Sequence, residues 1–274
     1  MMKHAAWFVR VKIRRHKNSK RILKIKLPLL LCLLPALNAH ADEAFTFSSG
    51  VDYSTGKYGA ADKTETLSIP LSAKYEFSDW TLRATIPYIE STGPSSVSGS
   101  GADRITLNNG QGSRHKATGF GDFVVAASNS VLASGPWLID VGAKVKFATA
   151  DKNEGLGTGE NDYSIQTEIY RTLDRHTVFG TLGYKKMGDP EGLNLKNPWF
   201  TSAGWSFRAA QPTAVGLSYD YRQKITENGA PLREVTGFVT HKLDQHWKIQ
   251  AYAVTGFSKA SPDLGAGIFV FYLH

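Results

Sequence analysis

The segment at residues 155–159, Gly-Leu-Gly-Thr-Gly, is glycine-rich in the way that phosphate-binding loops are. A phosphate-binding loop requires a buried parallel strand before it and a helix after it, so that the phosphate meets the helix N-terminus. Both flanks instead alternate between apolar and polar residues with a period of two, which is typical of antiparallel strands. The overlapping residues 151–155 resemble a calcium loop but lack its third oxygen ligand and its distal glutamate. We therefore expect a surface loop here, with no metal and no cofactor.

Four histidines have a side chain suited to acid–base chemistry: His115, His176, His241 and His246. A lipid hydrolase in a membrane barrel would need a nucleophilic serine beside the histidine and a polar group that orients it. No serine motif accompanies any of the four, and each lies in or beside an expected turn or loop. The sequence therefore predicts no catalytic residue, and a barrel lipid hydrolase is the least favoured interpretation.

The strands expected on either side of the glycine-rich loop are clearest in the segment 137–173. Its first half places Trp137, Ile139 and Val141 on one face, with Asp140 and Lys144 on the other. Because side chains alternate across a strand, this pattern predicts a strand with one apolar and one polar face. A single such hairpin is equally compatible with a soluble sandwich and with a transmembrane barrel. The pattern recurs from residue 42 to the C-terminus and predicts about twelve strands.

The lengths of the connections favour the barrel. Two kinds alternate along the chain, one of about two to four residues and one of about five to twenty-five, the longest spanning roughly residues 93–118. Short turns are expected at residues 78–79, 133–136, 174–175, 209–212 and 244–245. Up-and-down outer-membrane barrels have this asymmetry, with short periplasmic turns and longer external loops. The fold class predicted is all-β, a transmembrane antiparallel up-and-down β-barrel of about twelve strands.

Aromatic residues provide an independent indication, because they fall at the two ends of the expected strands. Two aromatic belts are typical of the two interfaces of a membrane, where the ring bodies meet the acyl boundary and their polar edges meet the headgroups. The level near the short turns contains Phe45, Phe47, Tyr75, Phe77, Trp80, Trp137, Phe207, Trp247 and Tyr272, and the other level contains Tyr88, Phe147, Tyr163, Tyr184, Trp199, Tyr221 and Phe257.

The N-terminal segment predicts export. Residues 1–26 are strongly basic, residues 27–37 are apolar, and a small-residue site ends at Ala41, so residues 1–41 are predicted to be a signal peptide and residues 42–274 the barrel. The leader holds ten of the 32 Lys and Arg residues and none of the 24 Asp and Glu residues, so its removal changes the formal charge from +8 to −2. That change removes the support for a nucleic-acid partner. The only cysteine, Cys32, also lies in the leader, which excludes a disulfide or thiolate metal site in the remainder.

The polar face of the expected strands would line the lumen, where charges of both signs occur. Sequence alone leaves open whether these charges form a polar passage or pair with one another and close it. Arg222 with Glu234 and Lys144 with Glu168 are expected cross-strand pairs. The residues predicted to line the lumen are Asp52, Lys74, Arg83, Asp122, Asp140, Lys144, Lys146, Asp162, Glu168, Arg208, Asp220, Arg222, Lys224 and Glu234, with Glu76 and Lys185 on the same face.

Several short motifs occur in an order that resembles a known family. They are Tyr-Ser-Thr-Gly-Lys-Tyr-Gly at 53–59, Ile-Pro at 69–70, Ile-Pro-Tyr at 86–88, Gly-Phe-Gly-Asp at 119–122, the glycine-rich loop followed by Asp-Tyr at 162–163, and Leu-Gly-Tyr at 182–184. In these motifs the chain resembles the bacterial outer-membrane family associated with transport in the phenol meta-cleavage degradation pathway, loosely grouped with barrels that import hydrophobic compounds. It departs from the family by having Ala-Thr-Ala-Asp at 148–151 in place of Pro-Thr-Gly-Asp, and by ending in His274 instead of an aromatic residue. The resemblance implies transport.

Together these features predict a passive, porin-like channel or transporter in the outer membrane of a Gram-negative bacterium, which would carry small molecules including aromatic or amphipathic ones. The expected partners are outer-membrane lipid, the barrel assembly machinery and a small-molecule solute. The alternative is a non-conducting surface barrel whose external loops, above all residues 93–118, bind a ligand or partner.

Overall fold

The computed structural model describes residues 43–98, 103–108 and 115–274, so the predicted signal peptide lies outside the described residues. All regular elements in the described ranges are strands. They are β1 (Glu43–Gly56), β2 (Thr64–Phe77), β3 (Trp80–Gly93), β4 (Ser95–Ser98), β5 (Ile105–Asn108), β6 (His115–Phe120), β7 (Phe123–Ser134), β8 (Trp137–Phe147), β9 (Asp162–Leu173), β10 (His176–Lys186), β11 (Trp199–Ala210), β12 (Thr213–Arg222), β13 (Leu232–Lys242), β14 (Trp247–Gly256) and β15 (Leu264–Leu273).

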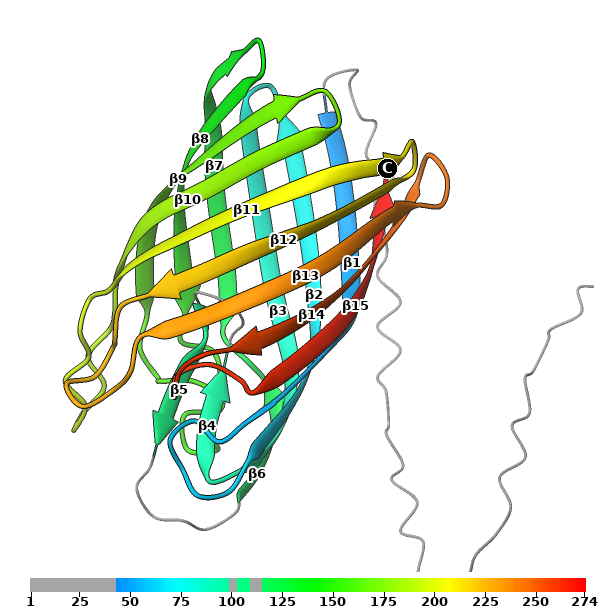
Figure 1. The fold of residues 1–274 in the computed structure, drawn as a ribbon. Helices are drawn as coiled ribbons and strands as arrows, with labels where there is room; N and C mark the ends of the chain where they lie inside the picture. Colours follow the sequence, from blue (N-terminus) through cyan, green and yellow to red (C-terminus); the bar gives the residue numbers. More distant parts are fainter. Residues whose placement is uncertain (1–42, 99–102, 109–114) are drawn as a thin grey trace, which may run out of the picture. The chain divides into compact units, whose positions relative to one another are not determined.

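The sheet closes on itself as an antiparallel barrel (Figure 1). Consecutive strands pair from β7 to β15, β15 pairs with β1, β1 with β2, and β2 with β3. Both β6 and β7 then pair with β3, so these two form one interrupted barrel strand and close the ring. The barrel therefore has the predicted twelve strands, and β4 and β5 form a separate two-stranded hairpin.

The interruption between β6 and β7 lies beside Pro87 of β3, which has no backbone N–H to donate. Pro70 of β2 lies directly opposite Pro87 of β3, and neither can donate a backbone hydrogen bond. The amide of Gly121 donates to the carbonyl of Pro87 at 2.8 Å. A Cβ at Gly121 would lie 2.8 Å from Pro87 Cγ and 2.7 Å from Ile89 Cδ1, so only glycine permits this approach. The strand bends here and presents Asp122 to the lumen.

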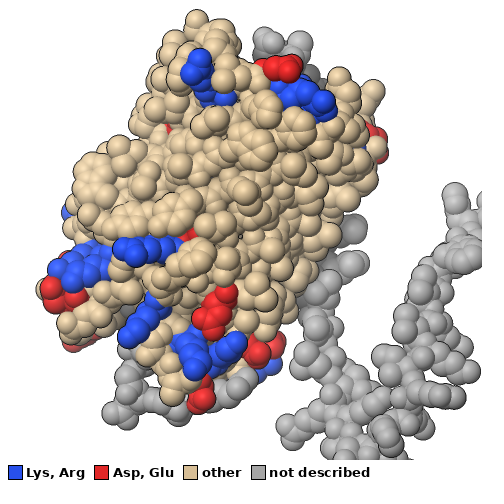
Figure 2. All heavy atoms as spheres, viewed as in Figure 1, with Lys and Arg blue, Asp and Glu red and all other residues tan. Residues whose placement is uncertain are grey.

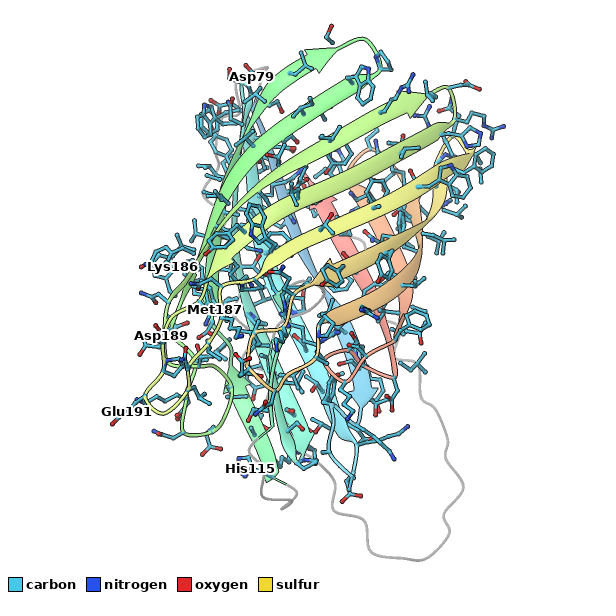
Figure 3. The ribbon with its side chains drawn as sticks, turned by 60° about the vertical axis from the view of Figure 1, so that its left-hand side comes forward. Asp79, His115, Lys186, Met187, Asp189 and Glu191 are labelled. Atoms are coloured by element: carbon cyan, nitrogen blue, oxygen red, sulfur yellow. The ribbon has the colours of Figure 1, made fainter. Side chains whose placement is uncertain are left out.

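The two ends of the barrel differ as predicted. Residues 78–79, 135–136, 174–175, 211–212 and 243–246 form short turns at one end, here called the short-turn end. The other end, here called the long-loop end, carries the connections 57–63, 148–161, 187–198, 223–231 and 257–263. Asp79 marks the short-turn end in Figure 3, whereas His115, Asp189 and Glu191 lie at the long-loop end. One prediction was wrong in part: the longest connection contains the β4–β5 hairpin and the start of β6.

The barrel wall has its apolar side chains outside. Ile165, Leu182 and Ile268 expose 63%, 57% and 54% of their surface, the reverse of a soluble core. Figure 2 shows a wide band without charged residues around the middle, with Lys, Arg, Asp and Glu gathered towards the two ends. Since lone exposed apolar residues are normal but a continuous exposed band is not, this surface is suited to lipid. No helix among the described residues is long and apolar enough to cross a membrane.

Aromatic rings cluster at both ends of the strands. At the short-turn end, Phe45 stacks on Tyr75 with ring centroids 4.4 Å apart, and Trp247 contacts Tyr272 at 5.0 Å. At the long-loop end, Tyr184 contacts Trp199 at 5.2 Å. These rings come from neighbouring strands, so strand pairing assembles the belts from residues that are distant in sequence.

Leu182 points outward near the middle of β10. The loss of stability on placing a charge at such an outward position should therefore depend on its depth in the membrane. The substitution Leu182→Arg should destabilise the barrel by about 2–4 kcal/mol, because it places a charge at the centre of the hydrocarbon layer. Leu173→Arg, at the end of β9, should cost only about 0–1 kcal/mol because that side chain lies near an interface. Reversible unfolding in denaturant with lipid vesicles measures both values. Equal costs at the two positions would contradict a transmembrane arrangement.

Candidate functional site

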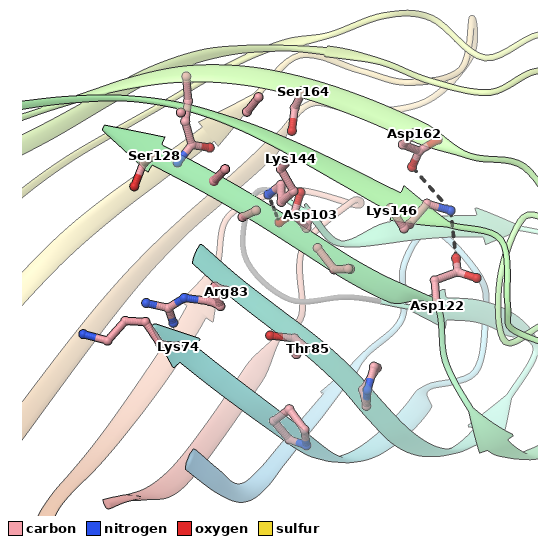
Figure 4. Close-up of a pocket in the computed structure, with 18 of the residues that line it drawn as sticks. Lys74, Arg83, Thr85, Asp103, Asp122, Ser128, Lys144, Lys146, Asp162 and Ser164 are labelled. Carbon is pink, nitrogen blue, oxygen red and sulfur yellow. Dashed lines mark hydrogen bonds and ion pairs between the residues drawn. The ribbon is translucent and has the colours of Figure 1, made fainter. Parts of the chain in front are cut away.

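The barrel encloses a cavity of about 720 Å³ lined mostly by polar and charged side chains. Nearly all barrel strands from β1 to β10 contribute, together with β14, β15 and the β4–β5 hairpin. Figure 4 shows part of this lining, with β2, β3, β8 and β9 presenting charged groups to the same space. Nine of the fourteen residues predicted to face the lumen line this cavity: Asp52, Lys74, Arg83, Asp122, Asp140, Lys144, Lys146, Asp162 and Glu168.

The other five predicted residues lie elsewhere. Arg222 and Glu234 are 1% exposed and pack against the segment that leads into β5. Asp220 lies half-buried directly opposite Glu234 on the neighbouring strand. Arg208 is exposed at the irregular short-turn end of β11, where its carbonyl accepts a hydrogen bond from Arg175. Lys224 lies beyond the end of β12, in loop 223–231, because the strand ends at Arg222; its ammonium donates to the carbonyl of Glu227 at 2.6 Å.

The β4–β5 hairpin is fixed to the barrel by backbone and apolar contacts. The amide of Ser95 donates to Thr64 Oγ1 at 3.1 Å, which joins β4 to the start of β2. Val97 and Ile105 are 2% and 3% exposed. Ile105 packs with Met187, Leu195 and Ile225, which lie in the long loops. The described part of the β4–β5 hairpin is therefore folded against the barrel.

Asp103, just before β5, joins two barrel strands through a pair of lysines. Its Oδ1 accepts from Lys185 of β10 at 2.5 Å, and its Oδ2 accepts from Lys144 of β8. Enclosure in the barrel by itself raises the pKa of Asp103, but the ammonium groups of Lys185 and Lys144 outweigh this and hold the pKa well below the usual range. The attraction is therefore present at neutral pH and is lost only as pH falls through the lowered pKa.

Arg104 makes a second, more deeply buried attachment. Its guanidinium forms an ion pair with Glu234 of β13, and the two side chains are 3% and 2% exposed. Arg222 of β12 donates to the backbone carbonyl of Arg104. Burying these charges is costly unless each finds a partner, so their mutual contacts favour this one position of the hairpin. The hairpin thus narrows the lumen at the long-loop end.

These contacts correct one of the expected cross-strand pairs. The register places Lys144 opposite Ser164 and Glu168 opposite Asp140, so Lys144 pairs with Asp103 and not with Glu168. Arg222 lies opposite Leu232, one diagonal place from Glu234. Sequence reasoning missed Asp103 and Arg104 because they lie in a segment rich in Gly and Ser. The available signal was an adjacent acid and base followed by Ile105, inside an otherwise uncharged stretch.

Lys146 is the centre of a further polar network at the long-loop end. Its ammonium donates to Asp122 at 2.7 Å and to the carbonyl of Glu160 at 3.0 Å, and it lies 3.5 Å from Asp162. Figure 4 shows the two carboxylates on opposite sides of the ammonium. The network ties β8 and β9 to the break before β7.

The glycine-rich loop rests on this network. As predicted, it connects two antiparallel strands, β8 and β9, which is not the setting of a phosphate-binding loop. Leu156 is 2% exposed and packs with Ile89, Ala117 and Ala150. A Cβ at Gly157 would lie 2.9 Å from Asp122 Oδ1, so the glycine allows the loop to approach the carboxylate. No group of three or more potential metal ligands occurs within the described ranges.

The four histidines are separated in the structure. His176 stacks on Trp205 and contacts Phe207, and His246 Nδ1 lies 2.9 Å from the carbonyl of Leu273, all at the short-turn end. His241 Nδ1 is 2.8 Å from Thr213 Oγ1. His115 begins β6 at the other end, 3.7 Å from Glu154.

No protein-family model matches the sequence, and no curated protein sequence matches it either. Among solved structures, the barrel is similar to an outer-membrane channel from Pseudomonas putida F1, with a TM-score of 0.67 and 12% identity over 86% of this chain and 97% of that chain. It is also similar to the NanC porin, with a TM-score of 0.53 and 9% identity over 82% of this chain and 98% of that chain. The chain therefore has the fold of an outer-membrane β-barrel. Membership of the phenol-pathway family remains a prediction.

The attachment of the hairpin predicts the effect of Asp103→Asn. The variant leaves the buried Lys185 without a carboxylate, which costs about 1–3 kcal/mol and favours displacement of the hairpin. Single-channel recordings in planar bilayers should show larger or more frequent open levels than the wild type. Asp189→Asn, an exposed acid in loop 187–198, is the matched control and should behave as the wild type. Equal conductance of all three proteins would contradict a restricting role for the hairpin.

Proposed function

We propose that the protein is a passive outer-membrane channel for small polar or amphipathic solutes. The observation that carries this proposal is a closed barrel that is apolar outside and encloses a charged cavity of about 720 Å³. A barrel that served only as a membrane anchor would need no cavity of this size, since small barrels are filled by side chains. The nine cavity residues of the predicted lumen set would line the solute path.

The cavity lining supports amphipathic solutes more than simple hydrocarbons. Tyr170, Tyr252 and Phe269 bring aromatic rings into the cavity beside its charges. Tyr252 donates a hydrogen bond to Asp52, and Tyr170 donates to Glu168 at 2.5 Å. A solute with both a ring and a polar group could contact both kinds of surface, whereas an uncharged hydrocarbon would displace water from carboxylates without replacing its hydrogen bonds.

Export and placement follow from the same proposal. Residues 1–41 would be removed as a signal peptide, and the barrel assembly machinery would insert the remainder with the short-turn end facing the periplasm. In that orientation the β4–β5 hairpin lies at the outer mouth, where a solute would enter.

Solute flux into liposomes tests the channel directly. Purified protein that keeps its heat-modifiable mobility in detergent gels should admit small neutral solutes faster than protein-free liposomes do. Asp103→Asn should increase that flux, because the hairpin restricts the outer half of the lumen. If neither protein raises flux above that of protein-free liposomes, the channel proposal is wrong.

A further inference from the structure

The half of the cavity near the short-turn end contains two pairs of like charges. Lys74 of β2 lies directly opposite Arg83 of β3, and Asp140 of β8 lies directly opposite Glu168 of β9. Figure 4 shows Lys74 and Arg83 side by side. Like charges placed directly opposite on antiparallel strands destabilise a sheet. All four side chains line the same cavity, so both unfavourable pairs face one space.

The basic pair is only partly neutralised. Lys74 forms an ion pair with Glu76 at 2.6 Å, on its own strand. Arg83 is exposed to the lumen, and its guanidinium has no hydrogen bond or ion pair with any other residue that the structure describes. Lys248 of β14 adds a third cation within electrostatic range of both. This wall of the cavity therefore has an excess of positive charge.

The acidic pair is held by neutral donors. Asp140 accepts a hydrogen bond from Ser130 at 2.7 Å, and Glu168 accepts from Gln166 and Tyr170 at 2.5 Å each. In the described parts of the chain, neither carboxylate has a Lys or Arg within ion-pair distance. The hydrogen bonds orient the carboxylates without cancelling their charge, so this wall has an excess of negative charge.

The two pairs lie near the same end of the barrel, on neighbouring parts of its wall. Arg83 is the fourth residue of β3 and Asp140 is the fourth residue of β8, each counted from the short turn. Only β7 separates β3 from β8, so the two pairs lie on adjacent parts of the curved wall and their side chains line the same cavity. Arg83 is also within electrostatic range of Tyr170, the residue that donates to Glu168. An electric field therefore runs between the basic pair and the acidic pair in this part of the lumen.

A field of this kind selects among solutes by the separation of charge within the solute and not by the solute's net charge. A simple anion is attracted to one wall and repelled by the other, and a simple cation likewise. A molecule with both an anionic and a cationic group can align with the field, so that each of its charged groups is attracted to the pair of opposite sign. Charges focused in a narrow passage also raise the local concentration of the solute that they favour.

We propose that Lys74, Arg83, Asp140 and Glu168 form a selectivity site for small zwitterions that carry a carboxylate and an ammonium group. The carboxylate would face Lys74 and Arg83, and the ammonium would face Asp140 and Glu168. This proposal rests on the channel function proposed above. It assigns a role to two like-charge pairs that lower the stability of the sheet.

Flux of two isomers into liposomes tests the proposal. β-Alanine is a zwitterion, whereas its isomer lactamide has the same atoms and no net or separated charge. The wild type should admit β-alanine faster than lactamide. The double variants Lys74→Gln/Arg83→Gln and Asp140→Asn/Glu168→Gln should each lower the flux ratio about two- to fivefold, the range expected for losing exposed charge interactions. Lys57→Gln, an exposed lysine in loop 57–63, is the control and should keep the wild-type ratio.

Reversal potentials in a salt gradient provide a second measurement. Loss of the basic pair should shift the channel towards cation selectivity, and loss of the acidic pair should shift it towards anion selectivity. Both variants remove a repulsion, so both should unfold at a temperature no lower than the wild type. Lactamide flux together with an unchanged isomer ratio in both variants would overturn the zwitterion site and leave the channel standing. No flux of either isomer in any of the proteins would overturn the channel itself.

Discussion

Closure of the sheet is the constraint on which the rest of the structure depends. In lipid, each backbone amide and carbonyl needs a partner within the protein, and an open sheet would leave two edges unpaired. Pairing of β3 with both β2 and the interrupted β6–β7 strand removes those edges. Because alternate residues of a closed sheet point inward, the polar face of each strand is enclosed together with its charges.

The enclosed charges have different neighbours in the two halves of the barrel. At the long-loop end, Lys144, Lys185 and Glu234 find partners in Asp103 and Arg104 of the segment between β4 and β5. At the short-turn end, like charges remain opposite one another. Charge satisfaction therefore orders the inserted hairpin at the long-loop end, while unbalanced charge is retained nearer the short-turn end.

One local irregularity contributes to this arrangement. The pairing of β3 with the neighbouring strand is irregular beside Pro87, and Asp122, which lies in this irregular part, accepts a hydrogen bond from Lys146. Lys146 in turn fixes the loop that carries Leu156 over the barrel mouth. Interruptions of strand pairing are frequent where a barrel must redirect a side chain, and here the interruption couples the wall to an external loop.

Alternation with a period of two is a local property, so the sequence alone determined most of the barrel strands, their approximate number and the faces of residues such as Leu71 and Lys74. The two-residue turn at Ser78 and Asp79 also sets the register that places Lys74 opposite Arg83. The pairing of Asp140 with Glu168 spans the loop 148–161, whose length leaves the register open until the strands are paired in space. The contact between Arg104 and Glu234 joins residues 130 positions apart. Only the tertiary structure could decide it, because no local pattern shows which enclosed charges a folded-in segment will reach.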